Sequence, residues 1–297
     1  MSALERLAPA KVNLFLHVGA VGADGYHPLS SLMTFADVGD VVAIEPARQM
    51  AFEITGPMGE GLSAAGDNLV VRARDAMLRT FGLGDQPFRL TLDKRLPIAA
   101  GIGGGSTDAA ATLLLIQETF GLPMDDETWG AMWQIACELG ADVPVCLVGE
   151  AKLGEGRGDE IDFPPVFPDL DAVLVNPGVP SPTGPVFRAY DEDGAPGGCD
   201  TPEFPEPMQD LGAVTAFLRR TRNDLEAPAI RLTPQIGEAL AILRAQPETA
   251  FARMSGSGAT CFALTESPAD AADLALRLSS RHPGWWVKAC RLKGFRP

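Results

Sequence analysis

Hydrophobic side chains follow two periods along this chain, one typical of strands and one typical of helices. In FRLTLD (88–93) apolar and polar side chains alternate, which predicts a strand with one buried face. After Asn68, apolar side chains recur about every 3.6 residues, which predicts a helix that ends near Gly82. Apolar runs rich in β-branched residues predict further strands at 11–21, 40–46 and 50–56.

The rest of the chain mixes the two patterns. Helices are predicted at 106–119, 126–139, 209–219, 234–245 and 268–280. Strands are predicted at 141–149, 169–178, 251–256, 259–264 and 285–292. This mixture is typical of an α+β protein. A change of composition near 150–165 predicts two domains, 1–160 and 161–297, and the acidic, Pro- and Gly-rich segment 191–207 is expected to be a mobile loop.

Composition narrows the classes of function. The 297 residues include 24 Lys and Arg against 39 Asp and Glu, a formal net charge of −15, so no chain-wide positive field can hold a nucleic acid. Five scattered cysteines and three histidines lack the spacing of a disulfide framework or a zinc site. Because no signal peptide or long apolar segment is found, we expect a cytoplasmic protein.

One glycine-rich stretch, GIGGGSTDAAATLLL (101–115), lies between a predicted strand and a buried helix. It matches no familiar phosphate-loop template, yet glycines before a helix start expose backbone N–H groups that favour an anion. The plain alternative is a sharp turn with Ser106 as an ordinary N-cap. Asp108 opposes the phosphate interpretation, since a carboxylate in the first helical turn competes for the same positive end. It must point away from the phosphates or help to hold their metal ion.

Two further glycine-dense stretches, 153–160 and 253–262, are by themselves typical of turns. Three separated glycine-rich loops in one chain make a composite site for phosphate and substrate more plausible than any one of them does.

Eight blocks of the sequence resemble, in order, the blocks of one known family. They are PAKVNLFLHV (9–18), ADGYHPLSSLM (23–33), DNLVVRA (67–73), DKRLPIAAGIGGGSTDAAATLL (93–114), LGADVPVCL (139–147), GEGRGDE (154–160), NDLE (223–226) and RMSGSGATCFAL (253–264). The glycine block and SGSGAT are typical of the GHMP kinase superfamily. ADGYH and GADVP, together with PAKVNLFLH, resemble its 4-diphosphocytidyl-2-C-methyl-D-erythritol kinase family.

This resemblance implies both a fold and a reaction. The fold would be the two-domain GHMP kinase fold, with an N-terminal domain of ribosomal-protein type and a ferredoxin-like C-terminal domain. The reaction would be ATP-dependent phosphorylation of the substrate's 2-hydroxyl, on the non-mevalonate route to isoprenoid precursors. ATP and Mg²⁺ would be the cofactors, although no carboxylate cluster identifies the metal ligands. The partners would be small molecules, with neither nucleic acid nor membrane, and the protein a monomer or homodimer.

The resemblance also assigns a catalytic pair, Lys11 of PAKVN and Asp142 of GADVP. An ordinary Asp has a pKa near ~4 and cannot deprotonate an alcohol in advance, but it can accept the proton as the bond to phosphorus forms. Lys11 would keep Asp142 ionised and offset charge on the transferred group. Without the family context, Lys11 would be an edge lysine of a strand and Asp142 a turn former.

The resemblance also implies which residues bind the substrate and ATP. Around the cytidine base and the polar groups of the substrate, the resemblance places Asn13, Tyr26, His27, Thr183 and Phe187. Around ATP, it places Asn68, Lys94, Pro97, Gly101, Gly103, Gly104, Gly105, Ser106 and Thr107. Asn68 is equally well explained as a helix N-cap, Tyr26 as an exposed hairpin aromatic, and Phe187 as core packing.

The sequence departs from the family at the start of the glycine block, where many members have Gly-Gly and this chain has Ala99-Ala100. Alanine stiffens that turn, so the loop geometry is in question there. Two rival functions remain open: another kinase of the superfamily, acting on homoserine, mevalonate or a sugar, and a nucleotide-binding sensor without activity. The aromatic group Tyr26, His27 and Phe187 opposes the first, and the presence of both Lys11 and Asp142 opposes the second.

Overall fold

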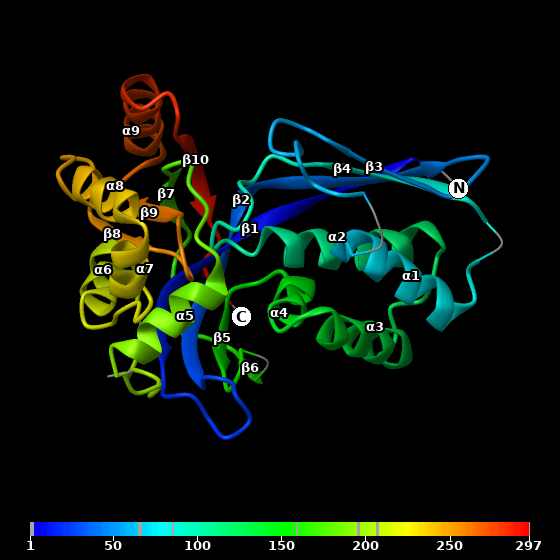
Figure 1. Ribbon diagram of the computed structural model, residues 1–297, viewed down its shortest axis with the longest axis horizontal. Coiled ribbons are helices and arrows are strands. Elements are labelled where there is room, and N and C mark those ends of the chain that lie inside the picture. Colours follow the sequence, from blue (N-terminus) through cyan, green and yellow to red (C-terminus); the bar gives the residue numbers. More distant parts are fainter. Residues whose placement is uncertain are drawn as a thin grey trace. The chain divides into compact units, whose positions relative to one another are not determined.

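The computed structural model describes residues 3–64, 67–84, 86–158, 160–194, 197–205 and 208–296 (Figure 1). The chain divides into two compact units. The first comprises Met1–Ala10, Gly39–Leu96 and Gly103–Gly149, and the second Lys11–Val38, Pro97–Ile102 and Glu150–Pro297. The strands β1 (Leu4–Val18) and β2 (Leu29–Pro46) contribute residues to both units. The division into 1–160 and 161–297 stays a prediction.

The first unit contains a small mixed sheet. Residues 41–46 of β2 pair antiparallel with β4 (Phe88–Asp93), which pairs in parallel with β3 (Ala51–Thr55). The predicted alternation of β4 is confirmed, because every second side chain from Phe88 to Leu92 is buried. On the other face, Arg89 forms ion pairs with Glu45 and Glu53 of the neighbouring strands.

Helices α1 (Leu69–Phe81) and α2 (Gly104–Thr119) lie on one face of these strands, and α3 (Asp126–Leu139) packs on both of them (Figure 1). Asn68 caps α1 as predicted, because its Oδ1 accepts the Val70 N–H at 2.9 Å. Gly82 ends α1 with a left-handed φ of 65°. The dense alanines and leucines of α2 are buried on most sides, as their sequence predicts.

The prediction of a strand at 141–149 is wrong, because Val143–Val148 forms a short helix, α4. Pro144 lies in its first turn, where a missing N–H costs nothing, and Gly149 ends the helix with a φ of 68°. Five consecutive side chains from Val143 to Leu147 are buried, so neither a strand period nor a helix period is visible in this stretch.

The second unit contains an antiparallel sheet. β10 (Trp286–Leu292) pairs with β7 (Leu170–Asn176), β7 with β9 (Cys261–Leu264), and β9 with β8 (Phe251–Met254). At its other edge, β10 meets β2 at the pair Leu292 and Ala36. β2 also pairs with β5 (Lys152–Glu155), which in turn pairs antiparallel with β6 (Glu160–Asp162).

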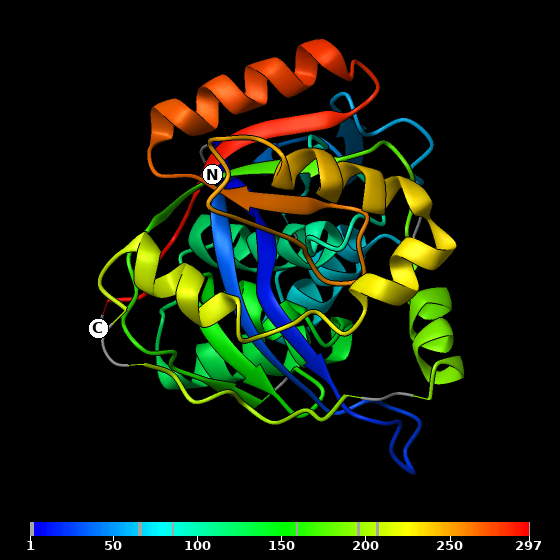
Figure 2. The same cartoon turned by 90° about the vertical axis from the view of Figure 1, so that its left-hand side faces the viewer.

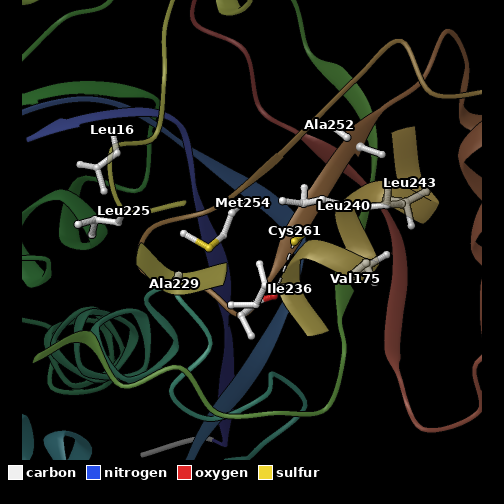
Figure 3. Packing of buried hydrophobic residues seen from close by; sticks show 14 of the residues in the cluster. Leu16, Val175, Leu225, Ala229, Ile236, Leu240, Leu243, Ala252, Met254 and Cys261 are labelled. Atoms are coloured by element: carbon white, nitrogen blue, oxygen red, sulfur yellow. Dashed lines mark hydrogen bonds between the residues drawn. The ribbon is translucent and has the colours of Figure 1, made fainter. Parts of the chain in front are cut away.

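Helices α8 (Pro234–Arg244) and α9 (Pro268–Arg281) pack on this sheet, as predicted, and α9 runs along β10 and β7 (Figure 2). The core between α8 and the strands is aliphatic (Figure 3). Ile236, Leu240 and Leu243 of α8 lie in one buried cluster with Val175, Ala252 and Cys261 of the strands. The predicted helix near 209–219 is α6 (Leu211–Leu218).

Several elements of the structure were not predicted from the sequence patterns, or only in part. β2 begins at Leu29, eleven positions before the predicted strand, because residues 30–36 are buried without alternation. Helix α5 (Thr183–Glu192) and helix α7 (Glu226–Leu232) are short and were not predicted. Short helices carry too few turns for a period to be recognised.

In the acidic segment 191–207, positions 195, 196, 206 and 207 lie outside the described residues. Its described part contacts the second unit: the Asp200 carbonyl accepts a hydrogen bond from His17 Nδ1, and Phe204 stacks on Phe217 with ring centroids 4.8 Å apart. In the described ranges, no helix has the length and hydropathy needed to cross a bilayer.

Candidate nucleotide and substrate site

The start of the glycine-rich stretch contacts a second glycine loop within the second unit. A Cβ at Gly101 would lie 2.5 Å from the Ser255 carbonyl oxygen and 2.7 Å from the Gly258 nitrogen. Gly101 and Gly256 both have left-handed backbone, with φ of 71° and 54°. The Ser255 hydroxyl donates to the Gly101 carbonyl at 3.0 Å. Two of the three predicted glycine loops therefore meet, and only glycine fits their contact.

The end of the stretch forms the start of α2 in the first unit. The prediction that the helix begins at Ser106 is wrong, because α2 begins at Gly104 and its N-cap is Gly103, with a φ of 64°. Glycine offers no side chain to satisfy the first N–H groups of the helix, and no side-chain cap bond is formed. Those N–H groups and the helix dipole suit a phosphate. The Thr107 hydroxyl donates to the Gly104 carbonyl at 2.9 Å, within the helix.

Beneath this helix start lies a buried cluster of one lysine and two carboxyl groups. Lys94 Nζ is 2.5 Å from Asp40 Oδ2 and 2.8 Å from Asp108 Oδ2. Asp40 Oδ1 also accepts the N–H groups of Arg95 and Leu96. The Lys94 ammonium group is thus engaged inside the protein, so its predicted contact with the nucleoside would have to use the main chain.

The buried position of this cluster shifts the pKa values of Asp108 and Lys94. Burial raises the pKa of Asp108 to about 7, with Asp40 adding to the rise and Lys94 opposing it. Burial also opposes the charge on Lys94, but Asp108 and Asp40 outweigh that effect and its pKa is raised. Asp108 Oδ1 is buried without a hydrogen-bond partner among the described residues. Asp108 therefore points away from the solvent at the helix start and need not compete with phosphate.

β1 carries Lys11 and Asn13 beside the glycine loops. The Lys11 N–H donates to the Ile102 carbonyl at 2.9 Å, and the Lys11 side chain is buried. The Asn13 N–H donates to the Ser255 hydroxyl at 3.0 Å, while its Nδ2 donates to the Ser31 hydroxyl at 2.7 Å. Asn13 Oδ1 is buried and has no hydrogen-bond partner in the described part of the chain. A polar group of a ligand could satisfy that oxygen.

His27 and Phe187, two of the three residues predicted around the base, lie together in the second unit. Their rings are tilted by 36° with centroids 4.9 Å apart. His27 Nδ1 donates to the Gly19 carbonyl at 3.0 Å, which fixes the ring orientation. Tyr26 is more than half exposed and its ring contacts Arg157, whose Cζ lies 4.1 Å from the ring centroid.

Helix α5 connects this aromatic pair to the second glycine loop. Thr183 and Phe187 are four residues apart and share one face of α5. The Thr183 hydroxyl shares a hydrogen bond of 2.9 Å with the Ser257 hydroxyl. The second unit thus gathers Thr183 and Phe187 with the loop that contacts Gly101.

Asp142 lies in the first unit, at the N-cap position of α4, and is half-buried. Its carboxyl group makes no cap hydrogen bond to the helix, although its carbonyl accepts the Cys146 N–H at 3.3 Å. The carboxyl group is therefore not used as a cap of α4.

Sequence reasoning missed four residues at these positions: Asp40, Ser255, Arg157 and Tyr190. Asp40 and Ser255 are fully buried polar side chains: Asp40 accepts the N–H groups of Arg95 and Leu96, and Ser255 donates to the Gly101 carbonyl. Only their partners, which are distant in sequence, reveal their roles. The Tyr190 ring packs edge-on against His27, with centroids 6.0 Å apart, and its hydroxyl donates to the Val18 carbonyl.

Comparison with known proteins identifies the family. The family model for the N-terminal domain of GHMP kinases matches residues 68–150, and the model for their C-terminal domain matches residues 204–284. A protein of Caulobacter vibrioides (strain NA1000 / CB15N) named 4-diphosphocytidyl-2-C-methyl-D-erythritol kinase is 53% identical over 290 residues, 97% of this chain and 99% of that protein. The chain belongs to the 4-diphosphocytidyl-2-C-methyl-D-erythritol kinase family.

Other members agree with this assignment. A kinase of the same name from Cereibacter sphaeroides (strain ATCC 17025 / ATH 2.4.3) is 47% identical over 98% of this chain and 99% of its own length. The crystal structure of a 4-(cytidine 5'-diphospho)-2C-methyl-D-erythritol kinase superposes with a TM-score of 0.76 at 34% identity, covering 98% of this chain and all of that one. The predicted α+β GHMP kinase fold is confirmed, and the protein is an ATP-using small-molecule kinase of this family.

The fold alone is shared more widely. A homoserine kinase from Cytophaga hutchinsonii has a TM-score of 0.67 at 20% identity, covering 99% of this chain and 98% of that one. Kinases of this family thus share their architecture with kinases for unrelated alcohols, so substrate choice depends on particular side chains.

Proposed function

We propose that this protein transfers the γ-phosphoryl group of ATP to the 2-hydroxyl of 4-diphosphocytidyl-2-C-methyl-D-erythritol. The observation that carries the proposal is the ring pair His27 and Phe187, held in the same unit as Asn13 and Thr183. An aromatic face stacked on a pyrimidine contributes about 1–3 kcal/mol, and a kinase for a small aliphatic alcohol has no use for it. Tyr26 would join this group from its exposed hairpin.

At the nucleotide end, the first N–H groups of α2 would bind the phosphates. Gly103, with its left-handed φ of 64°, allows the backbone turn that presents them. The residues proposed to surround ATP are Asn68, Lys94, Pro97, Gly101, Gly103, Gly104, Gly105, Ser106 and Thr107. The raised pKa of Asp108 weakens the negative charge that would otherwise oppose phosphate at this helix end.

For catalysis, we propose Asp142 as the group that accepts the proton of the 2-hydroxyl while the oxygen–phosphorus bond forms. Phosphoryl transfer through a loose transition state needs positioning more than a strong base, so an ordinary carboxylate suffices. Lys11, a buried cation on β1, would offset negative charge on the transferred group.

Mg²⁺ would accompany ATP and offset the charge of its phosphates. In the described ranges, no three His, Cys, Asp or Glu side chains gather as a metal site. This fits Mg²⁺, which keeps several waters and is held chiefly by phosphates with one or two protein oxygens. The Ser106 hydroxyl, in the first turn of α2, is the protein oxygen that we propose for it.

The ligands proposed here are small molecules, and the net charge of −15 opposes a nucleic-acid partner. A cytoplasmic location and a monomer or homodimer remain part of the proposal.

The test is a coupled assay of ADP release with ATP, Mg²⁺ and the cytidine-diphosphate substrate. ADP should appear only when that substrate is present, and homoserine or mevalonate should give none. Substrate-independent ADP release, or equal turnover of homoserine, would contradict the specific function.

The catalytic assignment is tested with Asp142→Asn, which should fold and bind ATP but lose about 10²- to 10⁴-fold in kcat. Asp126→Asn, an exposed aspartate in the first turn of α3, is the matched control and should keep full activity. If Asp142→Asn retains turnover, another group accepts the proton.

A further inference from the structure

A pocket of about 550 Å³ lies along the edge strand β8 of the second unit. Its lining includes four arginines from the segments around α6, α7, α8 and β8. We call it the arginine pocket and define it by Arg219, Arg222, Arg244 and Arg253, with Glu226 and Thr249. None of these residues has a role in the nucleotide and substrate site described above.

The lining of the arginine pocket is strongly positive in a strongly negative protein. Four arginines against one lining carboxylate leave a charge of 4 − 1 = +3, whereas the whole chain carries −15. Glu226 pairs with Arg244 at 2.9 Å. Arg222 pairs with Asp224, which is not part of the lining. Arg219 and Arg253 form no ion pair with any described residue, so positive charge is left over.

The arginines of the pocket also have N–H donors without a hydrogen-bond partner among the described residues. A guanidinium group has five N–H donors. Arg219 uses Nη2 on the Ala250 carbonyl at 2.8 Å and Nη1 on the Thr215 hydroxyl at 3.4 Å, and Arg244 uses only Nη2. Among the described residues, nothing bonds Nε of Arg219, or Nε and Nη1 of Arg244. The Thr249 hydroxyl oxygen is also buried without a hydrogen-bond partner in the described part of the chain.

Arg253 forms the inner wall of the pocket. It is only 7% exposed, and its hydrogen bonds go to the carbonyls of Leu14, Leu218 and Thr221 and to the Thr221 hydroxyl. Burial lowers the pKa of Arg253 to about 10, against the attraction of Glu226 and together with the repulsion of Arg244. All of its hydrogen-bond partners are neutral, so an anion in the pocket would stabilise this buried cation.

We propose that the arginine pocket binds a small anion that carries one or two phosphoryl groups, at a place separate from the glycine loops. The planar donor fork of arginine matches the oxygens of phosphate, and two guanidinium groups can hold one phosphoryl group between them. The volume suits a small molecule rather than a macromolecule.

The pocket is linked to the second glycine loop through Asn223, which is part of the lining. Asn223 Nδ2 donates to the Met254 carbonyl at 2.9 Å and to the Gly256 carbonyl at 2.8 Å. Arg253 Nη1 binds the carbonyl of Leu14 on β1, the strand that carries Lys11 and Asn13. A bound anion should therefore slow amide hydrogen exchange in the loop around Gly256.

The test is calorimetric titration of the full-length protein with inorganic pyrophosphate and with inorganic phosphate at constant ionic strength. Wild type should bind, and Arg219→Gln with Arg244→Gln should weaken binding at least about tenfold, because charge-assisted hydrogen bonds are lost. Arg220→Gln is the matched control: Arg220 is the exposed neighbour of Arg219, lies outside the lining, and contacts Phe217 instead. It should bind as wild type does.

Three outcomes would overturn the proposal: no binding by wild type, equal affinity in the double variant, or an equal loss in Arg220→Gln. Arg219 and Arg244 also bind backbone carbonyls at β8, so each variant is checked by thermal unfolding. A lower midpoint with unchanged anion affinity would mean that these arginines only cover a sheet edge, and would also overturn the proposal. Arg219→Lys keeps the positive charge but loses the planar donor fork of the guanidinium group. It should therefore weaken anion binding less than Arg219→Gln does.

Discussion

At the scale of the residue, the cluster of Lys94, Asp40 and Asp108 explains how an aspartate can stand in the first turn of a phosphate-binding helix. Two carboxyl groups share one ammonium group in a buried place, so one of them is favoured as the neutral acid. Asp40 has three donors, whereas Asp108 has one oxygen without a partner among the described residues. The pKa of Asp108 is therefore raised, first by burial and then by the neighbouring Asp40.

This cluster predicts a pH dependence of stability. Burial raises the pKa of Asp108 from the ordinary aspartate value of 3.8 to about 7 in the folded state. Between these values the folded state binds more protons than the unfolded state, so the free energy of unfolding falls as pH rises from about 4 to 7. Urea unfolding of wild type and Asp108→Asn should show a wild-type advantage that is largest near pH 4 and declines toward pH 7.

The control for this experiment is Asp126→Asn, whose carboxylate is exposed on α3. Its difference from wild type is subtracted as the effect of an Asp-to-Asn replacement outside the cluster. If the remaining Asp108→Asn difference does not change from about pH 4 to 7, the pKa of Asp108 is not raised in the folded protein.

The backbone conformation of Ala99 leads to a second prediction at the scale of the residue. Its φ of 50° is left-handed, a region that costs an L-residue about 1–2 kcal/mol, and it stands where many family members have glycine. Ala99→Gly should therefore raise the free energy of unfolding by up to about 1 kcal/mol, the relief of strain exceeding the added freedom of the unfolded chain. Ala100→Gly is the control, because Ala100 has ordinary backbone and is buried. It should destabilise the protein in the same urea titration.

At the scale of the element, the glycine stretch is two structures in sequence: a turn against the second glycine loop, and then an uncapped helix start. Gly101 belongs to the turn and Gly105 to the helix. Their substitutions should therefore have opposite effects on stability, although both residues belong to the same run in the sequence.

Gly101→Ala should lower the free energy of unfolding by more than about 2 kcal/mol, because its Cβ would meet backbone at 2.5 Å and its φ is 71°. Gly105→Ala should leave stability unchanged or raise it by about 0.5–1 kcal/mol, since its nearest neighbour is Leu69 Cδ1 at 3.4 Å and helices favour alanine. Equal effects in thermal or urea unfolding would contradict this division of the stretch.

Helix α4 could not be recognised as a helix from its sequence. Its sequence is as apolar and β-branched as a buried strand, and only Pro144 and Gly149 at its ends hint at a helix. The helix matters for function because it places the proposed proton acceptor Asp142 at an N-cap position rather than inside a strand.

At the scale of the whole molecule, charge is distributed unevenly. The chain carries −15, yet the proposed ligands are anions. Their binding must depend on local donors: the uncapped start of α2, Lys11, and the arginine pocket. The overall field then opposes the approach of nucleotides rather than steering them.

This predicts an unusual salt dependence. Raising ionic strength from about 20 to about 200 mM shortens the screening length and weakens the repulsion, so the association rate of Mg²⁺–ATP should rise or stay level. Stopped-flow fluorescence with a labelled nucleotide measures this rate. A steep fall with salt would mean that a local positive field controls the approach.

The sequence by itself determined the long periodic elements and the chemical blocks. β4, α1, α8 and α9 were predictable because an exposed face alternates with a buried one, or because capping residues mark the ends. The resemblance of eight ordered blocks determined the family, and with it the proposed roles of Lys11 and Asp142, which remain predictions.

Tertiary structure decided what depends on partners far apart in the chain. The first half of β2, α4 and α5 are buried or short, so their period carries no signal. The raised pKa of Asp108 depends on burial and on Asp40, against the opposing charge of Lys94, and the fit of Gly101 depends on Ser255 and Gly258. Burial and close contacts between residues arise only when distant segments pack together. The local sequence therefore does not predict them.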